Sequence, residues 1–398
     1  MLAFMKKIFD VLILGAGASG LMCAATLRQN SSLRIGVIEG NATAGKKLEI
    51  SGGGKCNITN ITVTPEHFAA EPTFVSDVLE RFGKEDLLNF LHVNAITLEL
   101  RKGRYYFCRH SAKEITALLL RDAQGVDFYY GHQIESAAYE SGYYRVTTDQ
   151  GLFSTRHLVI ATGGASYRQI GASDIGLRLA EGFQMRYTPF MPALVGLSLQ
   201  KEQFWMKTLS GISCAVRIRV GNKTLEEEML FTHKGISGPA VLSASLYWKK
   251  GEICINFLPH DALHVFLDSK KLLSTALPLS KRFMKAFLEH IGLEDKPCNR
   301  LSVSEQSILK CLQSYCFAPA GNFGFSKAEV SRGGISLDEL DAATLMSRRH
   351  PKLYCIGEVV DVTGELGGYN FQWAFSSAVV CARHIDAMSS VSYKKSKH

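Results

Sequence analysis

The chain has 398 residues, of which 46% are apolar and 21% are charged, which is enough material for two or three domain-sized units with buried cores. This composition excludes a disordered or collagen-like chain, and no segment approaches the ~18 consecutive apolar residues of a membrane-spanning helix. Lys and Arg outnumber Asp and Glu by 45 to 37, but the excess is spread over scattered pairs, so we interpret it as solvated surface and expect neither nucleic acid nor membrane as a partner.

The ten cysteines contain no Cys-x-x-Cys pair and form no short-spaced cluster with histidine. This pattern favours reduced thiols in a cytoplasmic protein and predicts no metal site. The N-terminal segment resembles a secretion signal in composition, but Asp10 interrupts its apolar run. Its glycines have a different explanation.

The opening of the chain is predicted to be a βαβ unit of a parallel sheet. Residues 9–14 and 34–39 are apolar runs typical of strands buried on both faces, and residues 21–28 between them have helical composition.

The turn of this unit carries the pattern G-x-G-x-x-G. In such a turn the first glycine makes a tight bend, the second lets backbone approach a pyrophosphate, and the third lets helix and strand pack closely. An acid 19 residues later, at the end of the second strand, accepts hydrogen bonds from ribose hydroxyls. Together these features predict a dinucleotide site made by Gly15, Gly17, Ala18, Ser19, Gly20 and Glu39.

Short alternating strands follow over residues 126–161, and the last of them, 157–161, is fully apolar and is expected to rejoin the parallel sheet. Residues 189–258 contain further strand-like pieces with a turn at Gly221-Asn222.

Three helical stretches come next, at 261–273, 280–291 and 302–315. From Lys352 the chain returns to a buried strand, which leads to a glycine turn and a helix over 372–388. The first domain is therefore discontinuous.

Two glycine-rich strand ends resemble the two-dinucleotide flavoprotein fold of the glutathione-reductase superfamily: Ala161-Thr162-Gly163-Gly164, and Gly357-Glu358 with Asp361. The resemblance implies that the first segment lies along FAD and that the late acid binds its ribityl or phosphate portion. Further segments are similar to a bacterial family of NAD(P)/FAD-dependent oxidoreductases that includes aminoacetone-oxidase-like and bile-acid dehydro-reductase-like flavoproteins: residues 45–57, 231–239, 331–335 and 357–374.

This resemblance covers nearly the whole chain and implies an α/β fold, in which a discontinuous Rossmann-like FAD-binding domain is interrupted by a β-barrel-like unit and a helical unit. The expected boundaries are 1–188 with 331–398 for the FAD domain, 189–258 with 317–330 for the β-barrel-like unit, and 259–316 for the helical unit. The sequence departs from the family at Arg168, where proline is common, and at Ser31, where the longer FAD fingerprint often has glycine.

Two loops fit a backbone that runs against an extended cofactor. In Ser51-Gly52-Gly53-Gly54-Lys55-Cys56-Asn57 the glycines expose N–H groups, and Lys47 or Lys55 offsets phosphate charge, with a plain surface turn as the alternative. The turn Gly367-Gly368-Tyr369-Asn370, followed by Gln372, precedes a helix, so its N–H groups are expected to stabilise the anionic reduced flavin.

The candidates for catalysis are Cys56, His233 and Tyr369. Cys56 has no second cysteine nearby in sequence, so we interpret it as a small loop residue rather than a redox thiol. His233 is either a proton donor or substrate-positioning group, or a structural histidine. Tyr369 and Trp373 stack near the flavin or line the substrate space, with core packing as the alternative for Trp373.

These features predict an FAD-dependent oxidoreductase that moves a hydride between NAD(P)H and a small organic substrate, with reduction of a conjugated or cyclic carbonyl compound as the leading reaction. The alternatives are an amine or aminoketone oxidase, and a non-catalytic, redox-responsive flavoprotein that binds RNA or a protein partner. Only one G-x-G-x-x-G opens a βαβ unit, so NAD(P)H is expected to be a transient co-substrate. No motif encodes the substrate or the oligomeric state.

Overall fold

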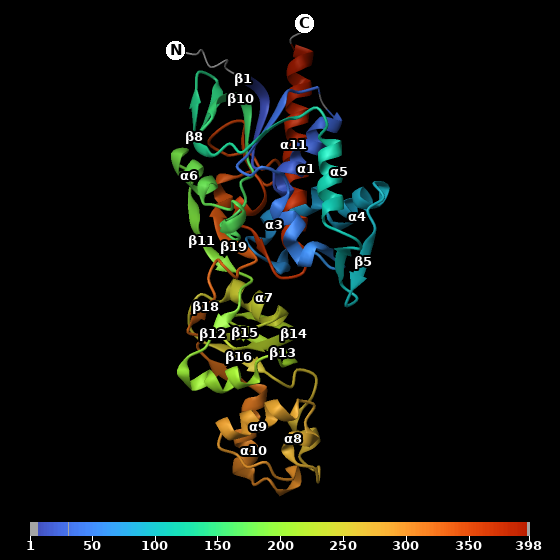
Figure 1. The fold of residues 1–398 in the computed structure, drawn as a ribbon, viewed down its shortest axis with the longest axis vertical. Helices are drawn as coiled ribbons and strands as arrows, with labels where there is room; N and C mark the ends of the chain where they lie inside the picture. Colours follow the sequence, from blue (N-terminus) through green and yellow to red (C-terminus); the bar gives the residue numbers. More distant parts are fainter. Residues whose placement is uncertain (1–6, 31, 396–398) are drawn as a thin grey trace. The chain divides into compact units, whose positions relative to one another are not determined.

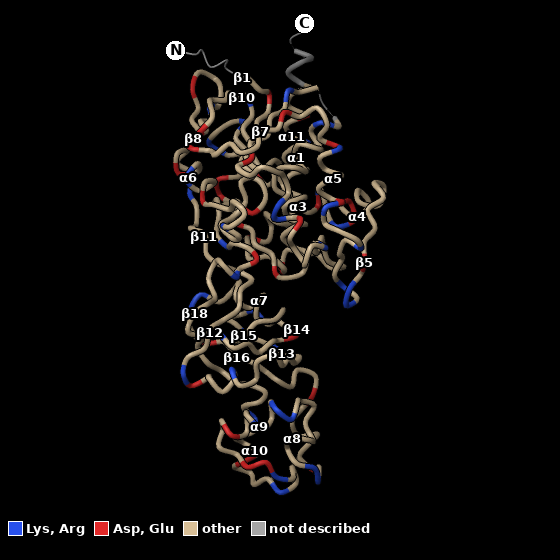
Figure 2. Tube along the Cα trace, in the orientation of Figure 1, with Lys and Arg blue, Asp and Glu red and all other residues tan. Residues whose placement is uncertain are grey.

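A computed structural model of the chain describes residues 7–30 and 32–395. It divides into two compact units, residues 1–191 with 330–398, and residues 192–329. Ser31 lies outside the described residues, so its departure from the fingerprint has no structural account. Figure 2 shows basic residues interspersed with acidic ones along both units.

Unit 1 is built on a mixed sheet whose centre is parallel. Strand β1 pairs in parallel with β2 and β10, β2 pairs in parallel with β7, and β10 pairs in parallel with β20. The antiparallel strands β9 and β8 extend the sheet beyond β10. The strands span Lys7–Leu14 (β1), Ile35–Glu39 (β2), Asp127–Tyr130 (β7), Ile134–Glu140 (β8), Tyr143–Thr148 (β9), Gly151–Ile160 (β10) and Leu353–Cys355 (β20).

The predicted βαβ unit and the return of residues 157–161 to the parallel sheet are confirmed. Residues 11–14 of β1 and 35–38 of β2 are buried on both faces of the sheet because helices cover it. Helix α1 (Ala18–Asn30) packs against the long C-terminal helix α11 (Tyr369–Lys395) and against α5 (Lys113–Asp122), as Figure 1 shows.

Residues 46–108 contain elements that the sequence reading left unassigned. Helix α3 (Pro72–Arg81) begins where the Glu71 side chain accepts hydrogen bonds from the amides of Thr73 and Phe74, which satisfies two exposed donors of the first turn. The other helices here are α2 (Lys46–Ile50) and α4 (Lys84–Val93). Strand β4 (Phe68–Ala69) pairs with β21 (Thr363–Gly364). A three-stranded sheet has the order β3 (Asn57–Asn60), β6 (Tyr105–Cys108) and β5 (Leu98–Arg101).

The rest of unit 1 brings the C-terminal part of the chain back to the core. Helix α6 (Ile175–Gly182) is followed by β11 (Tyr187–Ala193), which pairs with β19 (Val330–Ile335). This pairing places the segment that follows β19 in the same unit as the opening βαβ motif.

Unit 2 contains a seven-stranded antiparallel sheet of order β17-β16-β13-β14-β15-β12-β18. The expected turn at Gly221-Asn222 is confirmed, because Val220 pairs with Lys223 across it. The strands span Leu197–Ser198 (β12), Ser213–Val220 (β13), Lys223–Thr232 (β14), Gly235–Ser237 (β15), Ile253–Asn256 (β16), Tyr315–Phe317 (β17) and Gly321–Asn322 (β18), and α7 covers Pro239–Tyr247.

The helical part of unit 2 agrees with the sequence only in part. The predicted helix 280–291 is present as α9 (Lys281–His290), which buries Phe283 and Phe287. The predicted helix 261–273 is wrong: that stretch has one 3-10 turn, Leu263–Phe266, before α8 (Leu273–Ala276). The third predicted helix, 302–315, is present as α10 (Val303–Leu309) and a 3-10 turn (Lys310–Gln313), after which the chain extends into β17, where Tyr315 and Phe317 are buried.

One prediction about the cysteines is wrong. Cys254 on β16 lies opposite Cys316 on β17, and the two form a disulfide. The other eight cysteines are free. The pairing was not visible in the sequence because 62 residues separate the two thiols.

No helix in the described part of the chain is both long and apolar enough to cross a bilayer.

Candidate functional site

The glycine turn between β1 and α1 combines two closely packed positions with one open position. Gly15 has a φ of +105°, and a Cβ added to it would lie 2.5 Å from the carbonyl oxygen of Ala161. A Cβ on Gly20 would collide with the carbonyl oxygen of Gly15. A Cβ on Gly17, in contrast, would have no heavy atom within 4 Å. Gly15 and Gly20 therefore fix the shape of the turn, and Gly17 leaves the backbone accessible to a ligand.

The start of α1 lies against the segment that follows β20. Helix α1 begins at Ala18, and the buried side chain of Ser19 fills the space beside Gly357, where a Cβ would collide with it. The N-terminus of this helix presents unpaired N–H groups and the positive end of the helix dipole, which favour an anion.

The half-buried carboxylate of Glu39 closes the same turn. Its Oε2 accepts a hydrogen bond from the amide of Ala16 at 2.7 Å. Its Oε1 accepts bonds from the amide of Asn41 at 2.9 Å and from Asn41 Nδ2 at 2.7 Å. The acid is thus held beside the glycine turn, at the carboxyl end of β2.

The segment Ala161–Gly164 follows β10 at the same edge of the sheet, because Leu14 pairs with Ile160. Gly163 has a φ of +72° and open space around its Cβ position. A Cβ on Gly164 would lie 2.8 Å from Glu358 Oε1. Thr162 Oγ1 is buried and has no hydrogen-bond partner among the described residues.

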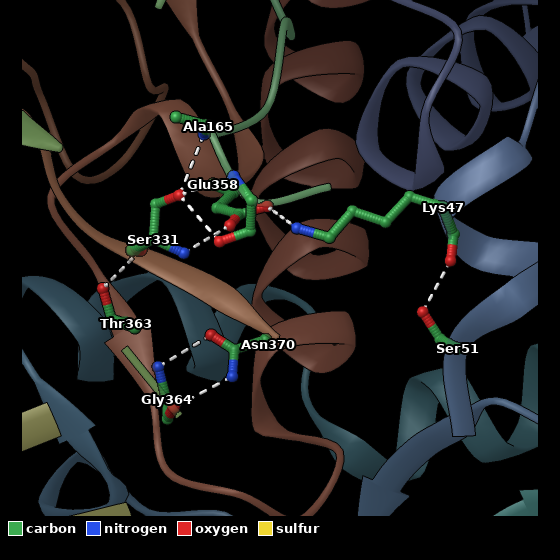
Figure 3. A network of polar contacts seen from close by, with 9 residues as sticks. Lys47, Ser51, Ala165, Ser331, Glu358, Thr363, Gly364 and Asn370 are labelled. Carbon is green, nitrogen blue, oxygen red and sulfur yellow. Dashed lines mark hydrogen bonds and ion pairs between the residues drawn. The ribbon is translucent and has the colours of Figure 1, made fainter. Parts of the chain in front are cut away.

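A polar network joins four segments of the chain at this edge (Figure 3). Glu358 Oε2 pairs with Lys47 Nζ at 2.6 Å, and Glu358 Oε1 accepts a bond from the amide of Ser331 at 2.8 Å. Ser331 Oγ accepts bonds from the amides of Ala165 and Ser166 at 2.9 and 3.1 Å. Lys47, one of the two lysines expected to offset phosphate charge, therefore has its charge offset by Glu358 in this structure.

Asp361, the second acid of this segment, is held at the same edge of the sheet by its backbone. Its amide donates to the carbonyl of Ile335 at 3.0 Å, and a Cβ on Gly334 would lie 2.6 Å from that amide nitrogen.

The loop from Ser51 to Asn57 has an unusual backbone. Gly52, Gly53 and Gly54 all have positive φ, between 58° and 84°, a conformation that favours glycine. A Cβ on Gly53 would have open space around it. Lys55 is half-buried, and Asn57 Oδ1 is buried without a partner in the part of the chain that the structure describes.

Cys56 is completely buried in this loop and has a φ of 43°. Although no second cysteine is near Cys56 in the sequence, Cys108 on β6 is near it in space, and its amide donates to the carbonyl of Cys56 at 3.4 Å. Burial raises the pKa of the Cys56 thiol well above its ordinary value, with the neighbouring Cys108 adding to the shift. Burial also raises the pKa of Cys108 to about 12. Both thiols are therefore protonated at neutral pH and weak as nucleophiles.

The turn before α11 is closed by Asn370, whose side chain accepts a bond from the amide of Gly364 and donates one to its carbonyl, both at 2.9 Å. Gly367 and Gly368 have φ values of 143° and 92°. Figure 3 shows Asn370 beside the Ser331 and Thr363 segment.

Tyr369 packs in the interior. Its side chain is 5% exposed and stacks on the ring of His67 at 4.5 Å, and burial raises its pKa. The structure thus gives its ring a packing role.

Gln372 and Trp373 are likewise buried in the α11 packing. Gln372 accepts a bond from Thr59 Oγ1 at 2.7 Å and donates one to Ser376 at 3.0 Å, and Trp373 Nε1 donates to the carbonyl of Gly357 at 3.1 Å.

His233 lies in unit 2, in the exposed turn between β14 and β15. The turn is held by Thr232 Oγ1, which accepts from the amides of Lys234 and Gly235. The remaining site candidates named from the sequence all belong to unit 1.

The sequence reading missed Ser331 as the residue that joins two loops and Cys108 as the neighbour of Cys56. The first lay within the segment 331–335 that carried the family resemblance. The second had no local signal, because the contact depends on the pairing of β3 with β6.

These residues fit an extended dinucleotide. Gly17, Gly53 and Gly163 offer backbone with open space, and two buried oxygens, Thr162 Oγ1 and Asn57 Oδ1, have no partner among the described residues. Buried polar groups are normally satisfied, so these atoms are suited to the polar groups of a cofactor. No cluster of three or more metal-ligating side chains occurs in the described residues.

Comparison with known proteins gives a consistent result. Residues 9–384 match a family model described as HI0933-like protein Rossmann domain. A ribosomal RNA dihydrouridine synthase of Escherichia coli is 36% identical over 397 residues, which cover 96% of this chain and 99% of the relative. A 3-dehydro-bile acid delta(4,6)-reductase of Clostridium scindens is 29% identical over 402 residues, covering 93% and 97%.

Among solved structures, a 3-ketosteroid-delta4-(5alpha)-dehydrogenase of Rhodococcus jostii, in complex with 4-androstene-3,17-dione, aligns with a TM-score of 0.50 at 11% identity. The alignment covers 96% of this chain and 98% of that one, and it shows a shared fold.

Proposed function

This chain belongs to the HI0933-like Rossmann family and is an FAD-dependent oxidoreductase, and we propose that it uses NAD(P)H to saturate the C5=C6 bond of a uracil in ribosomal RNA. The names of the two relatives describe one chemistry. A uracil ring and a 3-oxo bile acid with delta(4,6) unsaturation both contain a carbon–carbon double bond conjugated to a ring carbonyl. This is the class of acceptor expected from the sequence.

The proposed reaction balances with one nicotinamide per uracil. A hydride adds to C6, the carbon β to the C4 carbonyl, and a proton adds to C5. NAD(P)H is oxidised to NAD(P)⁺, so one NAD(P)H and one proton are consumed for each dihydrouridine formed. Bound FAD supplies the two-electron chemistry between the nicotinamide and the ring.

The residues of unit 1 have distinct parts in holding that cofactor. Gly17 leaves room for a pyrophosphate at the N-terminus of α1. Glu39 accepts hydrogen bonds from ribose hydroxyls, as acids at this position do. Thr162 and Asn57 provide the two buried oxygens that lack partners among the described residues. Cys56 remains a buried, protonated thiol in the loop wall.

The observation that carries the choice of RNA is the likeness to the Escherichia coli relative, which extends over 99% of that protein at 36% identity. The bile-acid reductase is less similar, at 29%. The choice departs from the expectation that nucleic acid is not a partner, and it gives the excess of basic residues a use.

The test is a direct assay on unmodified RNA. Holoprotein is incubated anaerobically with NADH or NADPH and with ribosomal RNA transcribed in vitro, which carries no modified nucleosides, and the RNA is cut into oligonucleotides by a base-specific ribonuclease for mass spectrometry. We expect dihydrouridine to appear at a defined position, in an amount that matches the nicotinamide oxidised.

Two controls separate the alternatives. A conjugated 3-oxo steroid replaces the RNA in one, and an aminoketone with oxygen and no nicotinamide replaces it in the other. Turnover of the steroid or aminoketone, with no dihydrouridine formed in any transcript, contradicts the proposal and assigns a small-molecule substrate.

A further inference from the structure

A short hairpin of unit 1 ends in a basic turn. Strands β5 and β6 are joined by a three-residue turn, Lys102, Gly103 and Arg104, in which Lys102 and Gly103 have φ values of 49° and 66°. The amide of Arg104 donates to the carbonyl of Arg101 at 3.0 Å and closes it. The hairpin is therefore a defined projection rather than an irregular loop.

Positive charge is concentrated along this hairpin. Residues 98–110 contain four Lys or Arg and one acid, Glu99. The pKa of Glu99 is lowered by a hydrogen bond from Arg101 and by the positive charges of Arg101, Lys55 and Arg109. Figure 2 shows the basic turn below β5. One carboxylate therefore faces three cations, so the local charge remains positive.

The same surface is hollowed and carries aromatic rings. A surface hollow is lined by Lys55, Leu98, Glu99, Arg109 and His110. The guanidinium of Arg101 lies 4.6 Å from the ring of the half-buried Phe107, and that of Arg104 lies 4.6 Å from the ring of Tyr105, which is buried beneath it. Guanidinium planes and aromatic rings are the groups on which unpaired RNA bases stack.

The hairpin is continuous with the loops assigned to the cofactor. The amide of Cys108 donates to the carbonyl of Lys55 at 2.9 Å, and Ala112 donates to Gly54 at 2.8 Å. On the other side, a Cβ on Gly367 would lie 3.1 Å from the ring of Tyr105. The basic surface is therefore hydrogen-bonded directly to the loop that is proposed to hold the cofactor.

We propose that this basic hairpin surface, formed by Lys55, Arg101, Lys102, Arg104, Arg109 and His110, binds the phosphate backbone of single-stranded RNA beside the target uracil. The inference rests on the proposed function for the identity of the polyanion. Each cation that neutralises a phosphate releases counterions, which makes binding weaken steeply with salt. A uracil held in a base pair cannot be reduced in place, so an unpaired strand is the form that this surface must hold.

The test compares two variants with the same loss of charge. The hairpin variant is Arg101→Gln/Lys102→Gln/Arg109→Gln. The control is Lys249→Gln/Lys250→Gln/Lys270→Gln, which removes three exposed lysines of unit 2. The binding of a fluorescein-labelled oligouridylate of about 20 nucleotides to each holoprotein is measured by anisotropy between roughly 50 and 200 mM salt. Flavin absorbance and thermal melting confirm that each variant is loaded and folded.

The hairpin variant is expected to bind at least about tenfold more weakly, with a salt slope smaller by about two, since each single-strand phosphate contact contributes about 0.7 to the slope. The control is expected to stay within about twofold of the unmodified protein. An equal loss in both variants, no loss in the hairpin variant, or no binding by the unmodified protein overturns the inference.

Binding that is lost in the hairpin variant supports the inference even when no dihydrouridine forms. In that case the proposed reaction alone fails. The two claims are therefore decided by different readouts.

Discussion

The carboxylate of Glu39 accepts hydrogen bonds from the amides of Ala16 and Asn41 and from the Asn41 side chain. They hold the carboxylate in place for the ribose hydroxyls of FAD, and because hydrogen bonds to a charged acceptor contribute roughly 1.5–3 kcal/mol, loss of the proposed ribose bonds in Glu39→Ala is expected to weaken FAD binding by roughly 10- to 150-fold. FAD content after gel filtration measures this effect, with Glu135→Ala, an exposed acid on β8, as the control. Full FAD content in the Glu39 variant counts against the assignment.

Cys108 gives a pH dependence with a definite sign. Burial raises its pKa to about 12, whereas an unfolded thiol ionises near pH ~8.5. The stabilisation from keeping the thiol neutral is therefore fully present below about pH 8.5 and is lost as the pH rises towards 12. We predict that the free energy of unfolding falls over this interval and that it falls less in Cys108→Ala. Denaturant titrations at several pH values test this, and an equal fall in both proteins contradicts it.

At the scale of single elements, different glycines of the β1–α1 turn are needed for folding and for cofactor binding. A Cβ at position 20 collides with the carbonyl oxygen of Gly15, whereas one at position 17 has open space. Gly20→Ala is therefore expected to lower the melting temperature strongly, because backbone must move. Gly17→Val is expected to preserve the fold of the FAD-free protein and to reduce FAD binding.

Circular dichroism melts and FAD content distinguish the two variants. Equal melting temperatures for the Gly17 and Gly20 variants, each in the FAD-free form, are the outcome that this geometry does not allow.

The same turn shows why part of the fold was predictable. The β1, α1 and β2 elements follow from apolar runs and glycine spacing within forty residues, and such signals are local. The network of Glu358, Ser331 and Lys47 could be predicted only in part, because the family resemblance located its segments but not the contacts among them.

Elements decided by distant contacts were missed or wrong. The Cys254–Cys316 bond joins residues 62 apart, and the proximity of Cys108 to Cys56 depends on strand pairing. Residues 261–273 have enough apolar residues for a helix, yet Leu263 and Leu273 are buried from separate short turns. Composition alone does not distinguish these arrangements.

At the scale of the whole molecule, one nucleotide-binding turn serves the described chain. It lies in unit 1, and the sheet of unit 2 is antiparallel, unlike a βαβ dinucleotide fold. We therefore expect NAD(P)H and RNA to use one flavin face in turn, which gives ping-pong kinetics. Initial rates at several fixed RNA concentrations should give parallel double-reciprocal lines, and intersecting lines would show that both bind together.

The central claim is that reduced holoprotein passes its two electrons to a uracil of ribosomal RNA. The most direct measurement is an anaerobic single turnover, in which protein reduced with one equivalent of NADPH, and freed of excess nicotinamide, is mixed with unmodified ribosomal RNA. We predict that the visible absorbance of oxidised flavin returns and that one dihydrouridine forms for each flavin reoxidised. Flavin that stays reduced with RNA, yet is reoxidised by a conjugated 3-oxo steroid, would contradict it.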